Sequence, residues 1–328
     1  MTASSTRPGP APCAPLTTPA HTPAPAADPR TPGASAYHRL AALSPLLSVR
    51  LGPPPSGDGW LTAADLAERP EAVRELIGHD ARQGLARYER PLRPDVAAGF
   101  GLHRAVWPLS LVFTLPWFLE RRVPLLGAGD VALRRGAGSA ELTVRPRGFV
   151  CLPDDPAAAA PAAAVPASAA PAAAVRVAAD ERALAAELRC ALDGFLAPVL
   201  AAFRPEVRRG PRVLWAMATD AVVEGLWYAG GLLGEAERAR DELSALLAPA
   251  AHPSGRADAP AGTAHAPGAP AGPAPAPSPF TPGAGFAAPA PDRGDAPEGC
   301  PRSRASCCLV YTVAPRDMCG GCPRVMRG

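Results

Sequence analysis

Half of the cysteines in this chain fall in one short segment close to its C-terminal end. In "CCLVYTVAPRDMCGGC", Cys307–Cys322, two adjacent cysteines are followed after ten residues by a Cys-x-x-Cys pair, so this segment holds four of the eight cysteines. Thiolates are soft ligands, and four of them suit either a zinc ion or an iron–sulfur cluster. A pair of disulfides and a set of redox-active thiols are the other chemistries that such a segment supports.

The spacing of the four cysteines bears on this choice. Two glycines separate Cys319 from Cys322, and glycine lets the backbone turn tightly enough for both sulfurs to face one centre. The side chains of Cys307 and Cys308 diverge because they are neighbours, whereas paired zinc ligands are usually spaced by about two to four residues. A two-iron cluster is larger than a single ion and accepts diverging sulfurs more easily. The residues themselves leave iron–sulfur, zinc and redox-active thiols open.

The same segment resembles a known family. "RSRASCCLVYTVAPRDMCGGCPR" is similar to the C-terminal signature of the FhuF-like ferric-siderophore reductases, in which a basic residue precedes Cys-Cys, an aromatic residue follows, and Cys-x-x-Cys is followed by proline. A weaker similarity lies in "GPRVLWAMATDAVVEGL", because family members commonly carry Arg-x-Leu-Trp in a helix ahead of the cluster. The signature positions in this sequence are Arg304, Cys307, Cys308, Tyr311, Cys319, Cys322 and Pro323.

The resemblance implies a cofactor, an activity and partners. In that family all four cysteines bind a [2Fe–2S] cluster, here Cys307, Cys308, Cys319 and Cys322. The implied activity is one-electron reduction of a ferric siderophore, of hydroxamate type, which releases Fe(II). A separate electron-donor protein or a chemical reductant must then supply the electrons, because "LGAGDVA" lacks the third glycine of a dinucleotide-binding loop. The long Ala/Pro insertions depart from the family and leave the substrate pocket unassigned.

Five arginines lie on either side of the cysteines. Positive charge near a cluster favours its reduced form and raises its potential. The alternative is that these arginines solvate an exposed tail or suit an acidic electron donor. The five are Arg302, Arg304, Arg316, Arg324 and Arg327.

Composition divides the chain into four parts. The 44 prolines and 31 glycines gather in three tracts that have little to bury. We therefore expect a disordered arm over 1–35, a mainly helical body over 36–249 with a linker at 153–174, a disordered linker over 250–299 and a cluster-binding segment over 300–328.

Helical patterns dominate the body and predict a mainly α fold. Thr62 and Asp65 have the spacing of a capping box. A helix capped by Asp180 is expected over about 179–203, with Leu184, Leu188 and Phe195 on one apolar face. The apolar stretch 105–119 predicts one buried helix or two short ones, and 140–153 predicts a small hairpin.

Charge and the N-terminal residues limit the location and the partners. The net charge of +3 and the lack of a basic stripe argue against nucleic-acid binding. The first twenty residues have no apolar core of a secretory signal, and the stretch 105–119 is short for a membrane span and contains Pro108 and Pro116. We expect a cytoplasmic protein, with contact to the inner face of the membrane left open. Thiols stay reduced in the cytoplasm, which weakens the disulfide alternative for the cysteine segment.

Other reactive side chains have simpler interpretations. Cys151 and Cys190 are expected as small buried hydrophobes, and Cys13 and Cys300 as bystanders in linkers. His103 is expected as a hydrogen-bonded structural histidine. Core packing is favoured over a substrate pocket for three aromatic residues, Trp215, Trp227 and Tyr228. Two other functions remain open: a zinc-stapled binding module without turnover, and an iron–sulfur redox sensor.

Overall fold

The computed structural model describes residues 34–158, 174–248, 280–282, 284–286, 302–315 and 322–323. The expected arm over 1–35 lies outside these residues except for its last two, which begin the first helix. Most of the Ala/Pro tracts expected over 153–174 and 250–299 also lie outside them. The division of the chain into four parts stays a prediction.

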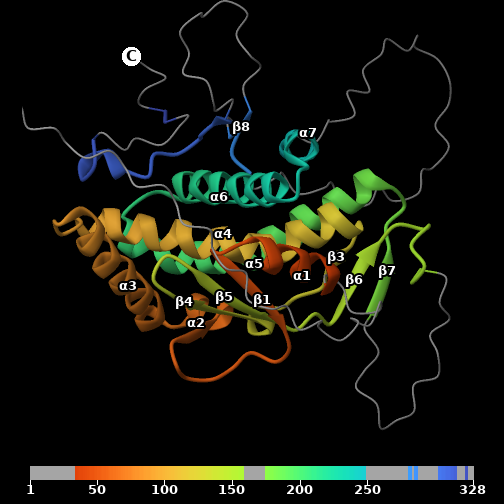
Figure 1. The fold of residues 1–328 in the computed structure, drawn as a ribbon, viewed down its shortest axis with the longest axis horizontal. Helices are drawn as coiled ribbons and strands as arrows, with labels where there is room; N and C mark the ends of the chain where they lie inside the picture. The colour runs from red at the N-terminus through yellow and green to blue at the C-terminus, as the bar shows by residue number, and fades with distance from the viewer. Residues whose placement is uncertain are drawn as a thin grey trace, which may run out of the picture.

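Helices make up most of the described residues, which confirms the expected mainly α class (Figure 1). The capping box predicted at Thr62 is present, because its hydroxyl accepts from the Asp65 N–H and the Asp65 carboxylate accepts from the Thr62 N–H. The helices are α1 (Ala34–Leu43), α2 (Ala63–Glu68), α3 (Pro70–Tyr88), α4 (Pro94–Glu120), α5 (Glu181–Val207), α6 (Pro211–Leu232) and α7 (Ala236–Leu247), with 3-10 turns at Ala128–Asp130 and Val310–Thr312.

Helix α4 is the centre of the fold, and α3, α5 and α6 all pack against it (Figure 1). It stays one continuous helix although Pro108 and Pro116 lie inside it. Each proline lacks the N–H that would bond the carbonyl four residues earlier. Side chains supply the missing donors: Arg135 donates to the Arg104 carbonyl at 3.3 Å, and the Tyr37 hydroxyl donates to the Val112 carbonyl at 2.6 Å.

Length and hydropathy alone would allow α4 to cross a membrane. It is the one helix among the described residues that meets both criteria, and 83% of its apolar window is buried by the rest of the protein. The apolar residues of α4 are therefore accounted for by packing against neighbouring helices.

Helix α5 begins and packs much as its sequence predicts. The Asp180 carboxylate caps it by accepting from the Ala183 N–H at 2.7 Å. The expected face is buried, since Leu184 and Leu188 are fully inaccessible and Phe195 is 5% exposed. The helix runs past its expected end to Val207, with two prolines inside it.

Two small sheets complete the body. The first has the order β1-β5-β4-β2 and the second the order β3-β6-β7. The hairpin predicted over 140–153 is wrong: β5 pairs with β4 and β1, whereas β6 pairs with β3 and β7. The strands are β1 (Leu47–Leu51), β2 (Trp60–Thr62), β3 (Val123–Pro124), β4 (Val131–Arg135), β5 (Ala140–Val144), β6 (Gly148–Cys151) and β7 (Ala174–Val177).

The C-terminal segment lies along α6 (Figure 1), and its cysteine pair also packs against the N-terminal part of α4. A short antiparallel pair, β8 (Gly285–Phe286) with β9 (Arg302–Ser303), joins it to the residues that precede it in the described chain. The ring of Phe286 meets the Trp227 ring of α6 edge-on, with centroids 5.8 Å apart. The segment is thus packed onto the helical body rather than tethered beside it.

Candidate metal centre and its neighbouring pocket

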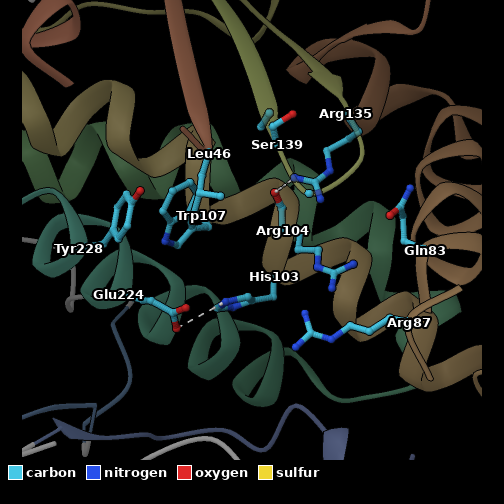
Figure 2. A pocket seen from close by; sticks show the side chains of 12 residues that line it. Leu46, Gln83, Arg87, His103, Arg104, Trp107, Arg135, Ser139, Glu224 and Tyr228 are labelled. Carbon is cyan, nitrogen blue, oxygen red and sulfur yellow. Dashed lines mark hydrogen bonds and ion pairs between the residues drawn. The ribbon is translucent and has the colours of Figure 1, made fainter. Parts of the chain in front are cut away.

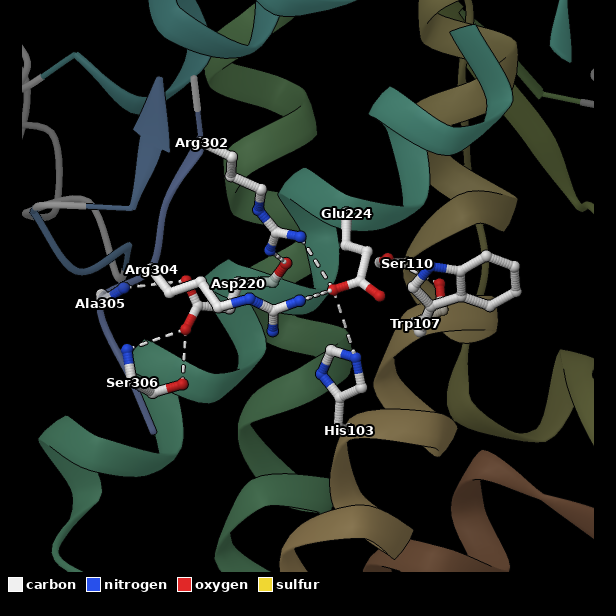
Figure 3. A network of polar contacts seen from close by, with 9 residues as sticks. All are labelled: His103, Trp107, Ser110, Asp220, Glu224, Arg302, Arg304, Ala305 and Ser306. Atoms are coloured by element: carbon white, nitrogen blue, oxygen red, sulfur yellow. Dashed lines mark hydrogen bonds and ion pairs between the residues drawn. The ribbon is translucent and has the colours of Figure 1, made fainter. Parts of the chain in front are cut away.

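Asp220, in the middle of α6, holds the backbone directly before the cysteine pair. Its carboxylate accepts hydrogen bonds from the N–H groups of Ala305 at 2.9 Å and Ser306 at 2.8 Å, and from the Ser306 hydroxyl (Figure 3). Asp220 is 1% exposed, so these donors replace the water that the carboxylate loses on burial. Because Cys307 follows Ser306, this contact fixes where the cysteine pair begins.

Glu224 lies one turn further along α6 and contacts two arginines and one histidine. One carboxylate oxygen contacts Arg302 at 2.8 Å, Arg304 at 2.7 Å and His103 of α4 at 3.6 Å (Figure 3). Arg302 also donates to the backbone carbonyl of Asp220. Residues four apart share one face of a helix, so α6 presents both acidic side chains to the C-terminal segment.

This arrangement lowers the pKa of Glu224 well below its ordinary value. Burial by itself would raise that pKa, but the hydrogen bond from His103 and the charges of His103, Arg304 and Arg302 outweigh it. Glu224 therefore stays ionised at neutral pH and keeps the two arginines bound to α6.

The cysteine pair packs on an apolar surface of α4. Cys307 and Cys308, both half-buried, contact a small cluster formed by Val96, Phe100 and Leu309. Leu309 has a left-handed backbone with φ of 61°, which is uncommon for a residue with a side chain and turns the chain immediately after the cysteines.

The remaining two predicted ligands are only partly described. Cys322 is 4% exposed, and Cys319 lies outside the described residues. Within the described part of the chain, no three His, Cys, Asp or Glu side chains form a group able to hold a metal ion. The assignment of all four cysteines as ligands remains a prediction.

The arginines before the cysteines have a different role from either one expected. Arg302 is 4% exposed and Arg304 is half-buried, and both bind Glu224 instead of solvating the segment. That carboxylate compensates part of their charge. Arg316, Arg324 and Arg327 lie outside the described residues.

A pocket of about 340 Å³ adjoins this network and shares Glu224 and His103 with it (Figure 2). One side is aromatic, formed by Trp107 and Tyr228, whose ring centroids are 5.4 Å apart. The other side is basic and carries Arg87, Arg104 and Arg135 (Figure 2). Pockets of this size bind small molecules or part of a larger one.

The pocket changes the interpretation of several residues. Tyr228 lines it, whereas Trp215 and Trp227 pack against the core as expected. His103 is a bonded histidine as expected, and it also faces the pocket. Cys151 is fully buried, but Cys190 is exposed, so the interpretation of Cys190 as a buried hydrophobe is wrong. Cys13 and Cys300 lie outside the described residues.

Sequence reasoning did not select the two residues that position the segment. Asp220 and Glu224 are the acidic residues of an otherwise apolar helix, and they are spaced four apart. Two carboxylates at one-turn spacing in a buried helix need compensating donors, so this pattern was a usable signal for a docking site.

Asp220 and Glu224 thus anchor a segment of clustered cysteines to α6, beside a pocket. Residues 304–324 match the family model described as the FhuF 2Fe-2S C-terminal domain. The C-terminal segment is therefore FhuF-like, as its resemblance implied, and its cofactor is a [2Fe–2S] cluster. The match indicates a redox role and applies to this segment alone. No curated protein matches the sequence.

The described residues fit such a cluster. Cys307 and Cys322 are free thiols, and thiolates are the usual ligands of a [2Fe–2S] centre. The backbone before Cys307 is held by Asp220, and bonded second-shell groups of this kind orient metal ligands. The apolar contacts of the cysteine pair limit its exposure to water.

Proposed function

We propose that this protein is a ferric-siderophore reductase. The observation that carries the proposal is the FhuF-type segment, matched over residues 304–324, whose anchor Glu224 also lines the pocket. A cofactor segment and a ligand-sized pocket that share one side chain are arranged for chemistry between the two.

When bound, a [2Fe–2S] cluster supplies one electron that converts chelated Fe(III) to Fe(II). Siderophores hold Fe(III) through hard oxygen donors, and these hold the softer Fe(II) less strongly. The electron is replaced by a separate donor protein or a chemical reductant, and the reaction takes place in the cytoplasm or at the inner face of the membrane.

The residues of this chain perform the positioning. Cys307, Cys308, Cys319 and Cys322 hold the cofactor, and Asp220 fixes the backbone before the first of them. Glu224 holds Arg302 and Arg304 against α6. Phe100 belongs to the apolar cluster against which the cysteine pair packs, and its ring lies 5.4 Å from the guanidinium of Arg104, which lines the pocket.

Rapid mixing tests this function. Anaerobic protein reduced with dithionite and freed of excess reductant is mixed with ferric chelates of hydroxamate and carboxylate type, and a chromogenic Fe(II) chelator reports the product. We expect reoxidation of the protein to match Fe(II) release in amount. Reoxidation no faster with any ferric chelate than with the iron-free compound would contradict the reductase and favour a redox sensor.

A further inference from the structure

The basic side of the pocket carries more positive charge than its neighbours balance. Arg104 binds the buried Asp80 at 2.6 Å, and Arg135 lies 3.6 Å from the same carboxylate oxygen. One carboxylate thus faces two guanidinium groups. Glu224, the acidic residue that lines the pocket, is bound to Arg302 and Arg304, so it compensates charge elsewhere.

Arg135 is held in place by the Asp80 carboxylate and by a backbone carbonyl. Pro108 leaves the Arg104 carbonyl without its helical donor, and an Arg135 Nη donates to it. The Arg135 side chain is only 11% exposed, and its buried Nε has no hydrogen-bond partner. Burial lowers the pKa of Arg135, and Asp80 only partly offsets this. Arg135 nevertheless lines the pocket, and a guanidinium there attracts an oxyanion.

Arg87 completes the basic side at the pocket entrance. It is exposed, and among the described residues it forms no ion pair; its guanidinium lies 5.6 Å from the ring of Tyr88. Arg87 comes from α3, Arg104 from α4 and Arg135 from β4, so three separate elements bring positive charge to one pocket (Figure 2).

We propose that this pocket binds a net-anionic, carboxylate-bearing ferric chelate through Arg87, Arg104 and Arg135. This inference rests on the proposed reductase function and gives it a substrate class. A complex of Fe(III) with three hydroxamates has no net charge at the metal centre, whereas replacing one hydroxamate by an α-hydroxycarboxylate makes the complex anionic. The guanidinium fork matches a carboxylate in shape and charge. The substrate class therefore differs from the hydroxamate expected from the sequence resemblance.

The size of the pocket fits part of such a chelate. Its volume of about 340 Å³ is at the low end of small-molecule sites, so the face of the chelate that carries the carboxylate enters and the rest stays outside. The aromatic pair opposite the arginines, Trp107 and Tyr228, offers apolar contact to the carbon skeleton of that face.

Gallium complexes test the binding without electron transfer, because Ga(III) replaces Fe(III) in oxygen chelates but is not reduced under these conditions. Calorimetry on the oxidised, cluster-loaded protein compares a gallium citrate-centred dihydroxamate with a gallium trihydroxamate. We expect the anionic complex to bind at least about tenfold more tightly at low salt, and the preference to shrink as ionic strength rises. Equal affinities at low salt would overturn the proposal.

Arg87→Gln is the matched variant, because it breaks no ion pair, and Arg82→Gln is its control. Arg82 is exposed on the same helix and does not line the pocket. We expect Arg87→Gln to weaken binding of the anionic complex by about three- to tenfold, with little effect on the neutral complex. Arg82→Gln should bind as the unaltered protein does. If Arg87→Gln leaves the preference for the anionic complex unchanged, that preference arises at another surface and the proposal is overturned.

Failure of this inference is distinguishable from failure of the reductase function. If the reduced protein is reoxidised by ferric chelates of both charges at equal rates and the gallium complexes bind equally, the reductase stands and the substrate class falls. If the anionic gallium complex binds with the expected dependence on Arg87 while no ferric chelate reoxidises the protein, the binding site stands and the reductase falls.

Discussion

The Asp220 carboxylate accepts the backbone N–H of Ser306 at 2.8 Å, one residue before the vicinal cysteines. The two residues are 86 positions apart, so this contact fixes the C-terminal segment on α6. We expect Asp220→Ala to release the cofactor at least about tenfold faster, because loss of bonded second-shell groups typically weakens metal sites to that extent. Decay of visible absorbance under a chelator, with iron and sulfide analysis, measures the effect.

Asp241→Ala is the control for that variant. Asp241 is a largely exposed residue of α7 that pairs with its neighbour Arg240. It should keep the cofactor as the unaltered protein does. Equal decay rates for the two variants would show that Asp220 does not position the cysteine segment.

The four predicted ligands are testable one at a time. Serine at Cys307, Cys308, Cys319 or Cys322 should lower the iron and sulfide content to less than about half, since the alkoxide is a poor replacement for a thiolate in such centres. Cys190→Ser is the control, because Cys190 is exposed on α5. Full iron occupancy in any one of the four variants would remove that cysteine from the ligand set.

Glu224→Gln should destabilise the docking of the segment. Arg302 has a side-chain exposure of 3% and Arg304 of 14%, and both would lose their carboxylate partner. Removing one member of a buried ion pair costs about 3–5 kcal/mol, and the partial exposure of Glu224 reduces this to roughly 2 kcal/mol. Urea unfolding of the loaded protein measures the change, with Glu141→Gln, an exposed-pair variant, expected to lose less than about 1 kcal/mol. Equal losses in the two variants would contradict a special role for Glu224.

Substitutions at Tyr37 and Pro116 are expected to have non-additive effects on the free energy of unfolding. Tyr37→Phe leaves the Val112 carbonyl, freed by Pro116, without a donor. An unsatisfied buried carbonyl costs about 1–3 kcal/mol. In a Pro116→Ala background the helix regains the N–H of residue 116, so the same Tyr37→Phe change should cost about 1 kcal/mol less. Additive losses in the double variant would refute this account of how α4 tolerates its proline.

Asp130 predicts a specific dependence of stability on pH. Burial would raise the pKa of Asp130, but hydrogen bonds from Arg147, Gly127 and Arg145 lower it below its ordinary value. A lowered folded-state pKa means that the stabilisation is complete above the unfolded pKa of about 3.9 and is lost as the pH falls through the folded value.

Asp130→Asn tests this dependence. The variant should be less stable than the unaltered protein by roughly 1–2 kcal/mol at pH 7, since both arginines are more than half exposed and the bonds are partly screened. The difference should shrink only below about pH 4. Urea unfolding from pH 3 to pH 7 measures it, and a difference that disappears between pH 5 and pH 7 would assign the effect to another group.

Local sequence patterns were sufficient to predict several structural elements. The capping box at Thr62 and the Asp180 cap involve side chains bonding a backbone N–H only three residues away, so the sequence itself contains both partners. The buried face of α5 follows from its three- and four-residue spacing. The cysteine spacing likewise carried the resemblance that the family match confirms over 304–324.

Contacts between residues far apart in the chain could not be predicted from the sequence in the same way. The stretch 140–153 was correctly expected to be extended, but its strands joined two different sheets because their partners, β1 and β7, lie far away in the chain. Pro108 and Pro116 left open whether 105–119 forms one helix or two, and α4 stays one helix because Arg135 and Tyr37 supply the missing donors from other elements.

The sequence by itself determined the helical class and the cysteine segment, because these depend on residue type and short-range spacing, and the family match assigned the cofactor. Only the tertiary structure decided that Asp220 and Glu224 anchor this segment, and that three arginines from α3, α4 and β4 meet in one pocket. The physical reason is that charge compensation on burial depends on which side chains approach in space, and residues as distant in sequence as Asp220 and Ser306, 86 positions apart, approach here.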